Sequence, residues 1–487
     1  MGNLFTRLKK ECLSLYDSPS EKNELFFFIL FGFYEAFNFF LKIRWNDTLD
    51  VDYIRIAFVE IIMLGAAVYF VVSIADWKHL ADRHIAVMIA AGLGLMAIGG
   101  YLSTRLSTNA FGVIFDMYFC LMVIGKDYKK ILRNTMWIGI CTIAFCAIGL
   151  PLGITKDIVK PNNSDPGHSL GTVYPNTWGY LVFLILLILW YLYLRKRTIK
   201  HLILTFAVFW GASAFMYFYI CCHTIAGLTI VFPIFAALAD WLEKKADLKA
   251  EEELKRAELE AEKKRKEELE RKKSHQKGKK GRQRSAQEDV KQEEAVLSSH
   301  TPHKHPYFVS FLKWLVVFIP YLSFAFVMFV STHYEWVHKH FYGHHSTKNL
   351  ALRFMQGGMY FAVYGIPMVG NPYDSRNIGY VDINGEFFQV GILDSSFASY
   401  IIMRGLLWVL LCMTWLCVAN WKALKKRDFA IPVIGLFILG YAMMERPGLE
   451  LWYNFILLYP LVKAGGKQGR ADGDRSDKHE RDTGRKN

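Results

Sequence analysis

Residues that bind anions or exchange protons recur in the polar segments between the long apolar runs of this chain. Among them are one arginine, two histidines, two acids and two asparagines: Arg353, His168, His223, Asp394, Glu445, Asn176 and Asn349. Arginine binds anions, and imidazole and carboxylate groups donate and accept protons. These residues lie far apart in the sequence, so the elements between them decide whether they form one site.

The composition is that of a membrane protein. Of the 487 residues, 53% are hydrophobic and 15% are aromatic. The charged residues, 21% of the chain, gather in residues 243–305 and in the C-terminal tail. The net charge of +14 comes mostly from Lys and Arg in short loops between apolar runs. That pattern is typical of membrane topology, so no nucleic-acid partner is expected.

About twelve apolar runs approach the length of roughly 20 residues that a helix needs to cross a bilayer. They span 24–43, 53–75, 84–102, 109–126, 131–150, 177–194, 200–220, 224–242, 308–332, 397–419, 428–444 and 448–464. The chain is therefore predicted to be an all-α, polytopic membrane helix bundle of about 12 transmembrane helices. The first run is expected to act as an uncleaved anchor.

Basic residues occupy every second loop, as Lys129, Arg195 and Lys425 illustrate. Because Lys and Arg are enriched in cytoplasmic loops, this alternation predicts a cell-membrane protein with both termini in the cytoplasm. All the candidate site residues then meet the outer leaflet, which suits a site for a lipid-linked substrate. External loops are polar in any membrane protein, so this placement alone leaves the site open.

Two long loops divide the chain. Residues 1–242 hold helices 1–8, a charged cytoplasmic insert covers 243–305, residues 306–464 hold helices 9–12 with a large external loop at 333–396, and 465–487 form a disordered tail. In the insert, pairs such as Glu251 and Lys255 predict a solvated helix that extends helix 8, followed by disorder after Lys273. It is either a spacer or an arm that binds a partner protein or acidic lipid.

Several short motifs occur in order along the external segments. They are His168-Ser-Leu-Gly171, Tyr174-Pro-Asn176 with Gly179, Cys222-His-Thr224, Asn349 with Arg353 and Tyr364-Gly365, Leu393-Asp394-Ser-Ser, and Glu445 with Asn454. This series resembles the Wzy-type polysaccharide polymerases of the O-antigen polymerase and ligase superfamily. The chain departs from the family pattern at two arginines, because His223 replaces one and the first loop has Gly167 and His168 near the position of the other.

The resemblance implies a GT-C-like bundle that moves a growing glycan from polyprenyl diphosphate onto a lipid-linked repeat unit. Arg353 would stabilise the departing phosphates, since its planar fork binds phosphate bidentately. His223, Asp394 and Glu445 are then the other catalytic candidates, as bases, charge-assisted donors or groups that orient Arg353. His168, Asn176 and Asn349 are the substrate-binding candidates, and His168 is also a candidate base. No cofactor is implied, and no metal-ligand spacing stands out.

Three other functions remain open at this point. A flippase for lipid-linked oligosaccharide would also have about a dozen helices, although it would be expected to have short external loops. A ligase of the same superfamily would carry a similar large external loop. A scaffold that binds assembly proteins through the insert would leave the external motifs unexplained. Separately, Glu35, Arg55, Glu60 and Asp116 lie inside apolar runs and are expected to face the bundle, in pairs or around a polar cavity.

Overall fold

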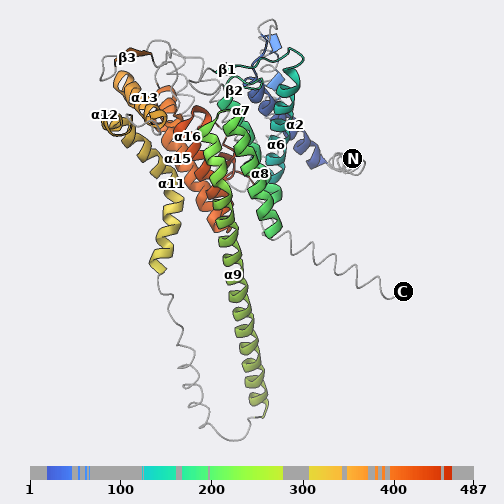
Figure 1. Ribbon diagram of the computed structural model, residues 1–487. Helices are drawn as coiled ribbons and strands as arrows, with labels where there is room; N and C mark the ends of the chain where they lie inside the picture. Colours follow the sequence, from blue (N-terminus) through green and yellow to red (C-terminus); the bar gives the residue numbers. More distant parts are fainter. Residues whose placement is uncertain are drawn as a thin grey trace.

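The helices lie side by side in a bundle, and one very long helix leaves it at one end (Figure 1). The computed structural model describes residues 19–46, a few positions between 53 and 65, residue 123, and residues 125–160, 167–195, 198–277, 306–342, 348–370, 379–381, 387–389, 395–450 and 454–462. Among these residues, strands form only two short antiparallel pairs, so the fold is helical throughout the bundle.

Within the described residues, the first half of the chain contains five α-helices. They are α2 (Pro19–Phe40), α6 (Tyr128–Gly149), α7 (Pro175–Leu189) continuing as the π-helical turn η2 (Trp190–Leu194), α8 (Ile199–Phe218) and α9 (His223–Lys277). Their starts follow local chemistry. The side chain of Asp127 accepts the N–H of Lys129 at 2.8 Å and caps α6. Pro175 occupies the first turn of α7, where its missing N–H costs nothing.

The second half adds helices and the segments between them. They are α11 (Pro306–Thr332), α12 (Tyr334–Val337), η3 (His338–Tyr342), α13 (Lys348–Tyr364), α14 (Ser396–Arg404), α15 (Leu406–Lys425), α16 (Ala430–Met444), η4 (Arg446–Leu449) and η5 (Phe455–Leu458). Strand β1 (Val159–Lys160) pairs with β2 (Gly167–His168), and β3 (Gly379–Val381) pairs with β4 (Phe387–Gln389). Both strand pairs lie at the end of the bundle opposite to the long helix (Figure 1).

Aromatic side chains fill the interior of the bundle. The rings of Tyr180 on α7 and Tyr441 on α16 stack with their centroids 4.0 Å apart, and both residues are buried. Phe209 on α8 stacks on Phe232 of α9 at 4.8 Å. Large apolar side chains such as Phe218 also cover the outer surface of the helices. An apolar exterior around an apolar core is what a helix bundle in lipid requires.

Among the described residues, six helices are long and apolar enough to cross a membrane: Tyr128–Gly149, Pro175–Leu194, Ile199–Phe218, His223–Leu269, Lys313–Thr332 and Leu406–Lys425. Two shorter apolar helices, Leu25–Phe40 and Ala430–Met444, lie beside them. The helical membrane bundle predicted from composition is therefore present at this coarse level. The number of about twelve crossings stays a prediction, because the runs 53–75, 84–102 and 109–126 fall almost entirely outside the described residues.

Two predicted runs differ from single straight helices. The run 397–419 is broken at Gly405, whose φ of +94° ends α14 and begins α15 in a new direction. The run 448–464 contains the short turns η4 and η5, and its described residues are buried against the bundle. Hydropathy measures apolar content, and it does not report these breaks in backbone direction.

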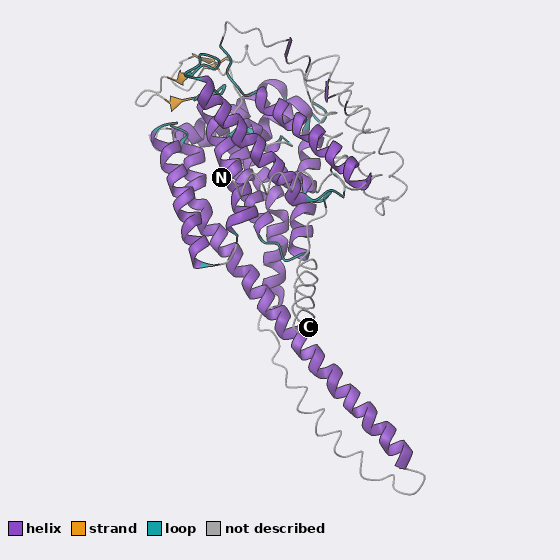
Figure 2. Cartoon of the chain, turned by 90° about the vertical axis from the view of Figure 1, so that its right-hand side faces the viewer, coloured by secondary structure: helices purple, strands orange, loops and turns teal. Residues whose placement is uncertain are grey.

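The predicted solvated helix continues α9 far beyond the bundle. Residues 251–269 are all exposed, and the helix reaches Lys277, slightly past the predicted change at Lys273 (Figures 1 and 2). We call residues 251–277 the arm. Two of the predicted ion pairs are formed, Lys255 with Glu251 at 2.8 Å and Lys266 with Glu262 at 3.0 Å. Such pairs support a helix that has no bundle to pack against. The rest of the insert and the predicted tail lie outside the described residues.

Candidate functional site

Arg353 and Glu445 form an ion pair at the end of the bundle opposite to the arm. Arg353 lies on α13, and Glu445 directly follows α16. Nη1 of Arg353 donates to Oε1 of Glu445 and to the carbonyl of Met444. The side chains are only 18% and 9% exposed, respectively. A charged pair this shielded from water is costly to separate, so the two residues hold one another in place.

Asn176 joins this pair from a third segment. Its Nδ2 donates to Oε1 of Glu445 at 2.9 Å, across a sequence separation of 269 residues. Asn176 is the second residue of α7, which begins at Pro175 after the extended residue Tyr174. One carboxylate oxygen therefore accepts hydrogen bonds from both an arginine and an asparagine. Three of the residues singled out in the sequence meet here, although no local signal linked them.

The backbone around Glu445 is held by a short network. Glu445 leaves the helix in an extended conformation, with φ −135° and ψ 145°. Its carbonyl accepts the hydroxyl of Ser396, and the same hydroxyl oxygen accepts the N–H of Gly448 at 2.9 Å. Asn454 in turn donates to the carbonyl of Gly448 at 3.2 Å. These hydrogen bonds hold the backbone that carries the carboxylate of Glu445 in place.

The tight turn between α8 and α9 packs against α7, the helix that carries Asn176. Cys221 adopts a φ of +58°, and an added Cβ at Gly179 on α7 would lie 3.2 Å from Sγ of Cys222. His223 follows as the first residue of α9, but its side chain is exposed, and its ring lies 4.7 Å from that of Tyr217. The structure therefore packs the turn against the helix that carries Asn176, while the contact that it gives His223 is aromatic.

His168 lies on β2, in a hairpin that stands beside this turn. Its Nδ1 is 2.7 Å from Oδ2 of Asp157, and its ring stacks on Tyr219 at 5.0 Å with an angle of 13° between the planes. An added Cβ at Gly167 would lie 2.9 Å from the carbonyl oxygen of Ile220 and 3.6 Å from Cγ of Pro175. The hairpin thus packs against the turn before α9 and the start of α7.

Asp157 was missed in the sequence, and the structure shows why it matters. Its carboxylate accepts from the N–H of Leu170 at 2.9 Å and from the hydroxyl of Ser169 at 3.2 Å, besides its contact with His168. Burial by itself would raise the pKa of Asp157, but the hydrogen bonds from these three residues outweigh it and hold the pKa below its usual value. The carboxylate is therefore ionised at neutral pH. The contact requires that β1 and β2 lie side by side, which no local pattern in the sequence predicts.

The remaining predicted site residues are less defined. Asn349 lies on α13 one helical turn before Arg353, and Asp394 lies outside the described residues. In the described part of the chain, no group of three His, Cys, Asp or Glu side chains is arranged to hold a metal ion. Of the charges predicted inside the membrane, Glu35 accepts a hydrogen bond from Thr135 on α6, and Arg55, Glu60 and Asp116 lie outside the described residues.

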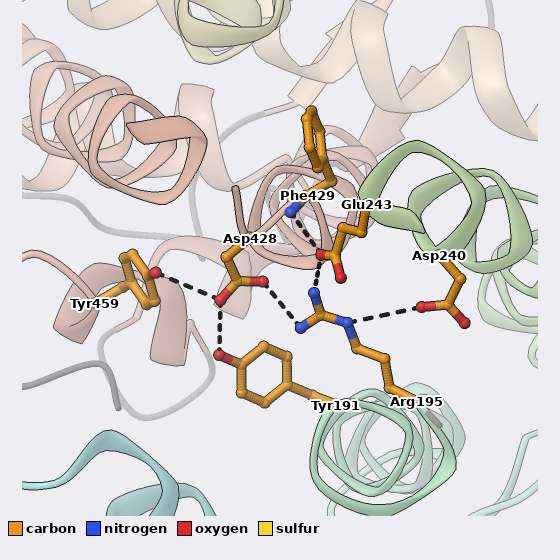
Figure 3. A network of polar contacts seen from close by, with 7 residues as sticks. All are labelled: Tyr191, Arg195, Asp240, Glu243, Asp428, Phe429 and Tyr459. Carbon is orange, nitrogen blue, oxygen red and sulfur yellow. Dashed lines mark hydrogen bonds and ion pairs between the residues drawn. The ribbon is translucent and has the colours of Figure 1, made fainter. Parts of the chain in front are cut away.

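A second polar network lies at the other end of the bundle, where the arm begins (Figure 3). Arg195 forms ion pairs with Glu243, with Asp428 at 2.9 Å and with Asp240 at 3.7 Å. The hydroxyls of Tyr191 and Tyr459 donate to Oδ2 of Asp428 at 2.9 and 3.4 Å, and the N–H of Phe429 donates to Glu243 at 2.8 Å. The network joins η2, α9, the start of α16 and the segment after η5.

We call the network around Arg195 a structural joint, because it links separate segments of the bundle to one another. Arg195 is 15% exposed and Glu243 is 1% exposed, so both charges are shielded from water. These contacts tie the base of the arm to three other segments. The residues that the sequence named as site candidates meet instead at the opposite end, where Asn176 and Arg353 both bond to Glu445.

Comparisons with known proteins neither support nor contradict a function for this site. No family model, no curated protein and no solved structure matches the chain. The contacts of Arg353, Glu445, Asn176 and His168 are consequently the basis on which a function is proposed.

Proposed function

We propose that the protein is a polysaccharide polymerase of the outer face of the cell membrane. It transfers a growing glycan from polyprenyl diphosphate onto a lipid-linked oligosaccharide repeat unit. Both termini and the arm lie in the cytoplasm, where the arm is available to polysaccharide-assembly proteins. This orientation rests on the alternation of basic loops. The reaction uses no sugar nucleotide and no cofactor, because the lipid diphosphate is itself the leaving group.

The observation that carries the proposal is the meeting of Arg353, Glu445 and Asn176 at one end of the bundle. A guanidinium there can stabilise the negative charge that develops on the departing diphosphate. Glu445 already accepts from both Arg353 and Asn176, so its contacts favour a role in orienting Arg353 over a role as base. Asn176 is placed to add a hydrogen bond to a sugar hydroxyl.

The reaction balances without a further reactant. The hydroxyl oxygen of the acceptor sugar attacks the anomeric carbon of the growing glycan, and the bond from that carbon to the diphosphate oxygen breaks. The polyprenyl diphosphate leaves with the electron pair, next to Arg353. The hydroxyl proton passes to a base on the protein. The convergence of two polar side chains on one carboxylate supports a site of this kind. A polar loop without such contacts would give no such support.

The test is Arg353→Ala in a strain that lacks the chromosomal copy, scored by the length of its surface glycan. We expect polymer to be lost while single repeat units still reach the surface, because removal of one charge stabiliser costs about 100-fold or more in rate. Arg427→Ala is the matched control. Its guanidinium donates to the carbonyl of Ala246 near the arm, away from the proposed site, and polymer length should stay normal.

Other outcomes separate the rival functions. Repeat units that stay inside the cell in Arg353→Ala would favour a flippase. Full-length polymer that accumulates on the lipid carrier would favour a ligase. Polymer of normal length on the cell surface would contradict the assignment of the site to Arg353.

A further inference from the structure

The hairpin of β1 and β2 determines which ring nitrogen of His168 carries a proton. Oδ2 of Asp157 lies 2.7 Å from Nδ1 of His168. The carboxylate is ionised at neutral pH, since the burial that raises its pKa is outweighed by hydrogen bonds that hold the pKa below the usual value. An ionised carboxylate only accepts hydrogen bonds, so Nδ1 carries the proton. In the neutral ring, the second nitrogen, Nε2, then has a lone pair that can accept a proton.

The ring of His168 is also fixed in direction. Tyr219 stacks on one face of it with the planes 13° apart. The contacts therefore involve Nδ1 and one ring face, and the side chain remains 31% exposed. A carboxylate that holds Nδ1 of a histidine in this way is the arrangement by which proteins orient an imidazole to act as a base through Nε2.

The hairpin stands beside the proposed site. Gly167, next to His168, packs against Ile220 and Pro175. Pro175 precedes Asn176, which bonds to Glu445, and the turn after Ile220 contains Cys222, whose Sγ would lie 3.2 Å from a Cβ added at Gly179 on α7. The hairpin thus rests on the start of α7, which supplies Asn176 to the Arg353–Glu445 pair, and on the turn that packs against the same helix.

We propose that His168 is the base that accepts the proton of the acceptor hydroxyl, and that Asp157 is the positioning residue that keeps His168 in the Nδ1–H form. This inference rests on the proposed polymerase function and deepens it. As the hydroxyl oxygen bonds to the anomeric carbon, its proton moves to Nε2 of His168. The bond to the diphosphate breaks, and the proton later leaves His168 to water.

Asp157→Asn tests the positioning role, because the hydrogen-bond donors around residue 157 determine how the new amide is oriented. The N–H of Leu170 and the hydroxyl of Ser169 both donate to Oδ1, so the amide oxygen of the substituted side chain is expected to stay at that position. The amide nitrogen then faces His168 and donates to Nδ1. That contact requires a lone pair on Nδ1 and places the proton on Nε2, which removes the base without removing the histidine.

The first measurement is the tautomer of His168 in the full-length chain, labelled with ¹⁵N-histidine in lipid nanodiscs. His168→Gln identifies the signal by its loss. We expect Nδ1–H in the wild type and Nε2–H in Asp157→Asn, with the thermal unfolding temperature nearly unchanged. An Nδ1–H signal that persists in Asp157→Asn would overturn the positioning role.

The second measurement is the surface glycan length in the deletion strain, complemented with each variant. We expect His168→Gln and Asp157→Asn to lower polymerisation about 100-fold, as loss of a general base does. Asp247→Asn, the same chemical change at the base of the arm, should leave it unchanged. An inverted tautomer with normal polymer would show that His168 is not the base.

Different results would overturn the polymerase function and the role of His168 as base. A deletion strain with an unaltered glycan would overturn the polymerase function and the base role with it. Loss of polymer in the deletion strain, together with full polymer in both His168→Gln and Asp157→Asn, would overturn the base role alone.

Discussion

At the scale of residues, Glu445 is the centre of the proposed site, because one of its oxygens accepts from both Arg353 and Asn176. A shielded ion pair adds little net stability when complete, yet removal of one partner leaves a charge without compensation. Sequence motifs pointed to all three residues. They could not say that Glu445 acts as a shared acceptor, because the contacts span helices that are distant in the chain.

Glu445→Ala is therefore expected to destabilise the protein by about 3–5 kcal/mol, since Arg353 keeps its charge and loses its carboxylate. Adding Arg353→Met should recover part of that loss, because the second change removes the unpaired charge. Thermal or denaturant unfolding of the single and double variants in detergent measures the coupling. Strictly additive effects would contradict a direct ion pair. Neither variant should support polymer formation.

At the scale of elements, the break between α14 and α15 shapes the segment that supports Glu445. Gly405 has a φ of +94°, and an added Cβ would lie 2.3 Å from the carbonyl oxygen of Met368. Only glycine fits there without strain. The break allows α14, which contributes Ser396, to run in a different direction from the membrane-length helix α15.

Gly405→Ala is expected to lower the stability by at least about 1–3 kcal/mol, the usual cost of a strained backbone conformation, and by more if Met368 cannot move. Gly211→Ala on α8 is the control, because an added Cβ there meets no atom within 4 Å. In that helical position alanine should be neutral or stabilising. Unfolding temperatures of the two purified variants decide the matter. Equal temperatures would refute the strain at Gly405.

At the scale of the whole molecule, α9 connects the two polar ends. It begins at His223 beside the proposed site, and Glu243 lies about 20 residues later, or about 30 Å along the helix. That distance matches the hydrocarbon thickness of a bilayer. The ion pairs of Arg195 with Glu243 and Asp428 then lock the helix to the bundle just before the arm begins (Figure 3).

Arg195→Ala should consequently destabilise the bundle by about 3–5 kcal/mol, because shielded carboxylates lose their shared cation. Arg427→Ala, which removes one exposed hydrogen bond nearby, should stay within about 0.5 kcal/mol of the wild type. Denaturant unfolding followed by tryptophan fluorescence compares the two. A similar small effect for both would show that the network around Arg195 is not a joint.

The sequence by itself determined the kind of molecule. Apolar runs near bilayer length, basic residues in alternate loops and acid–base pairs four residues apart follow from local spacing, so they predict a helical membrane bundle with a helical arm. The short motifs and the family resemblance that they carry named Arg353, Glu445, Asn176 and His168 as candidates. They did not decide that the first three share one hydrogen-bonded cluster, or that His168 contacts Asp157 through Nδ1.

Only the tertiary structure decided those contacts, as it decided the helix break at Gly405 and the network around Arg195. The physical reason is that helix packing sets which ends of which helices meet, and packing depends on shape and backbone direction across the whole chain. Hydropathy records how much apolar surface a segment has to bury. The partner against which it is buried, and the side chains thereby brought together, are properties of the folded bundle.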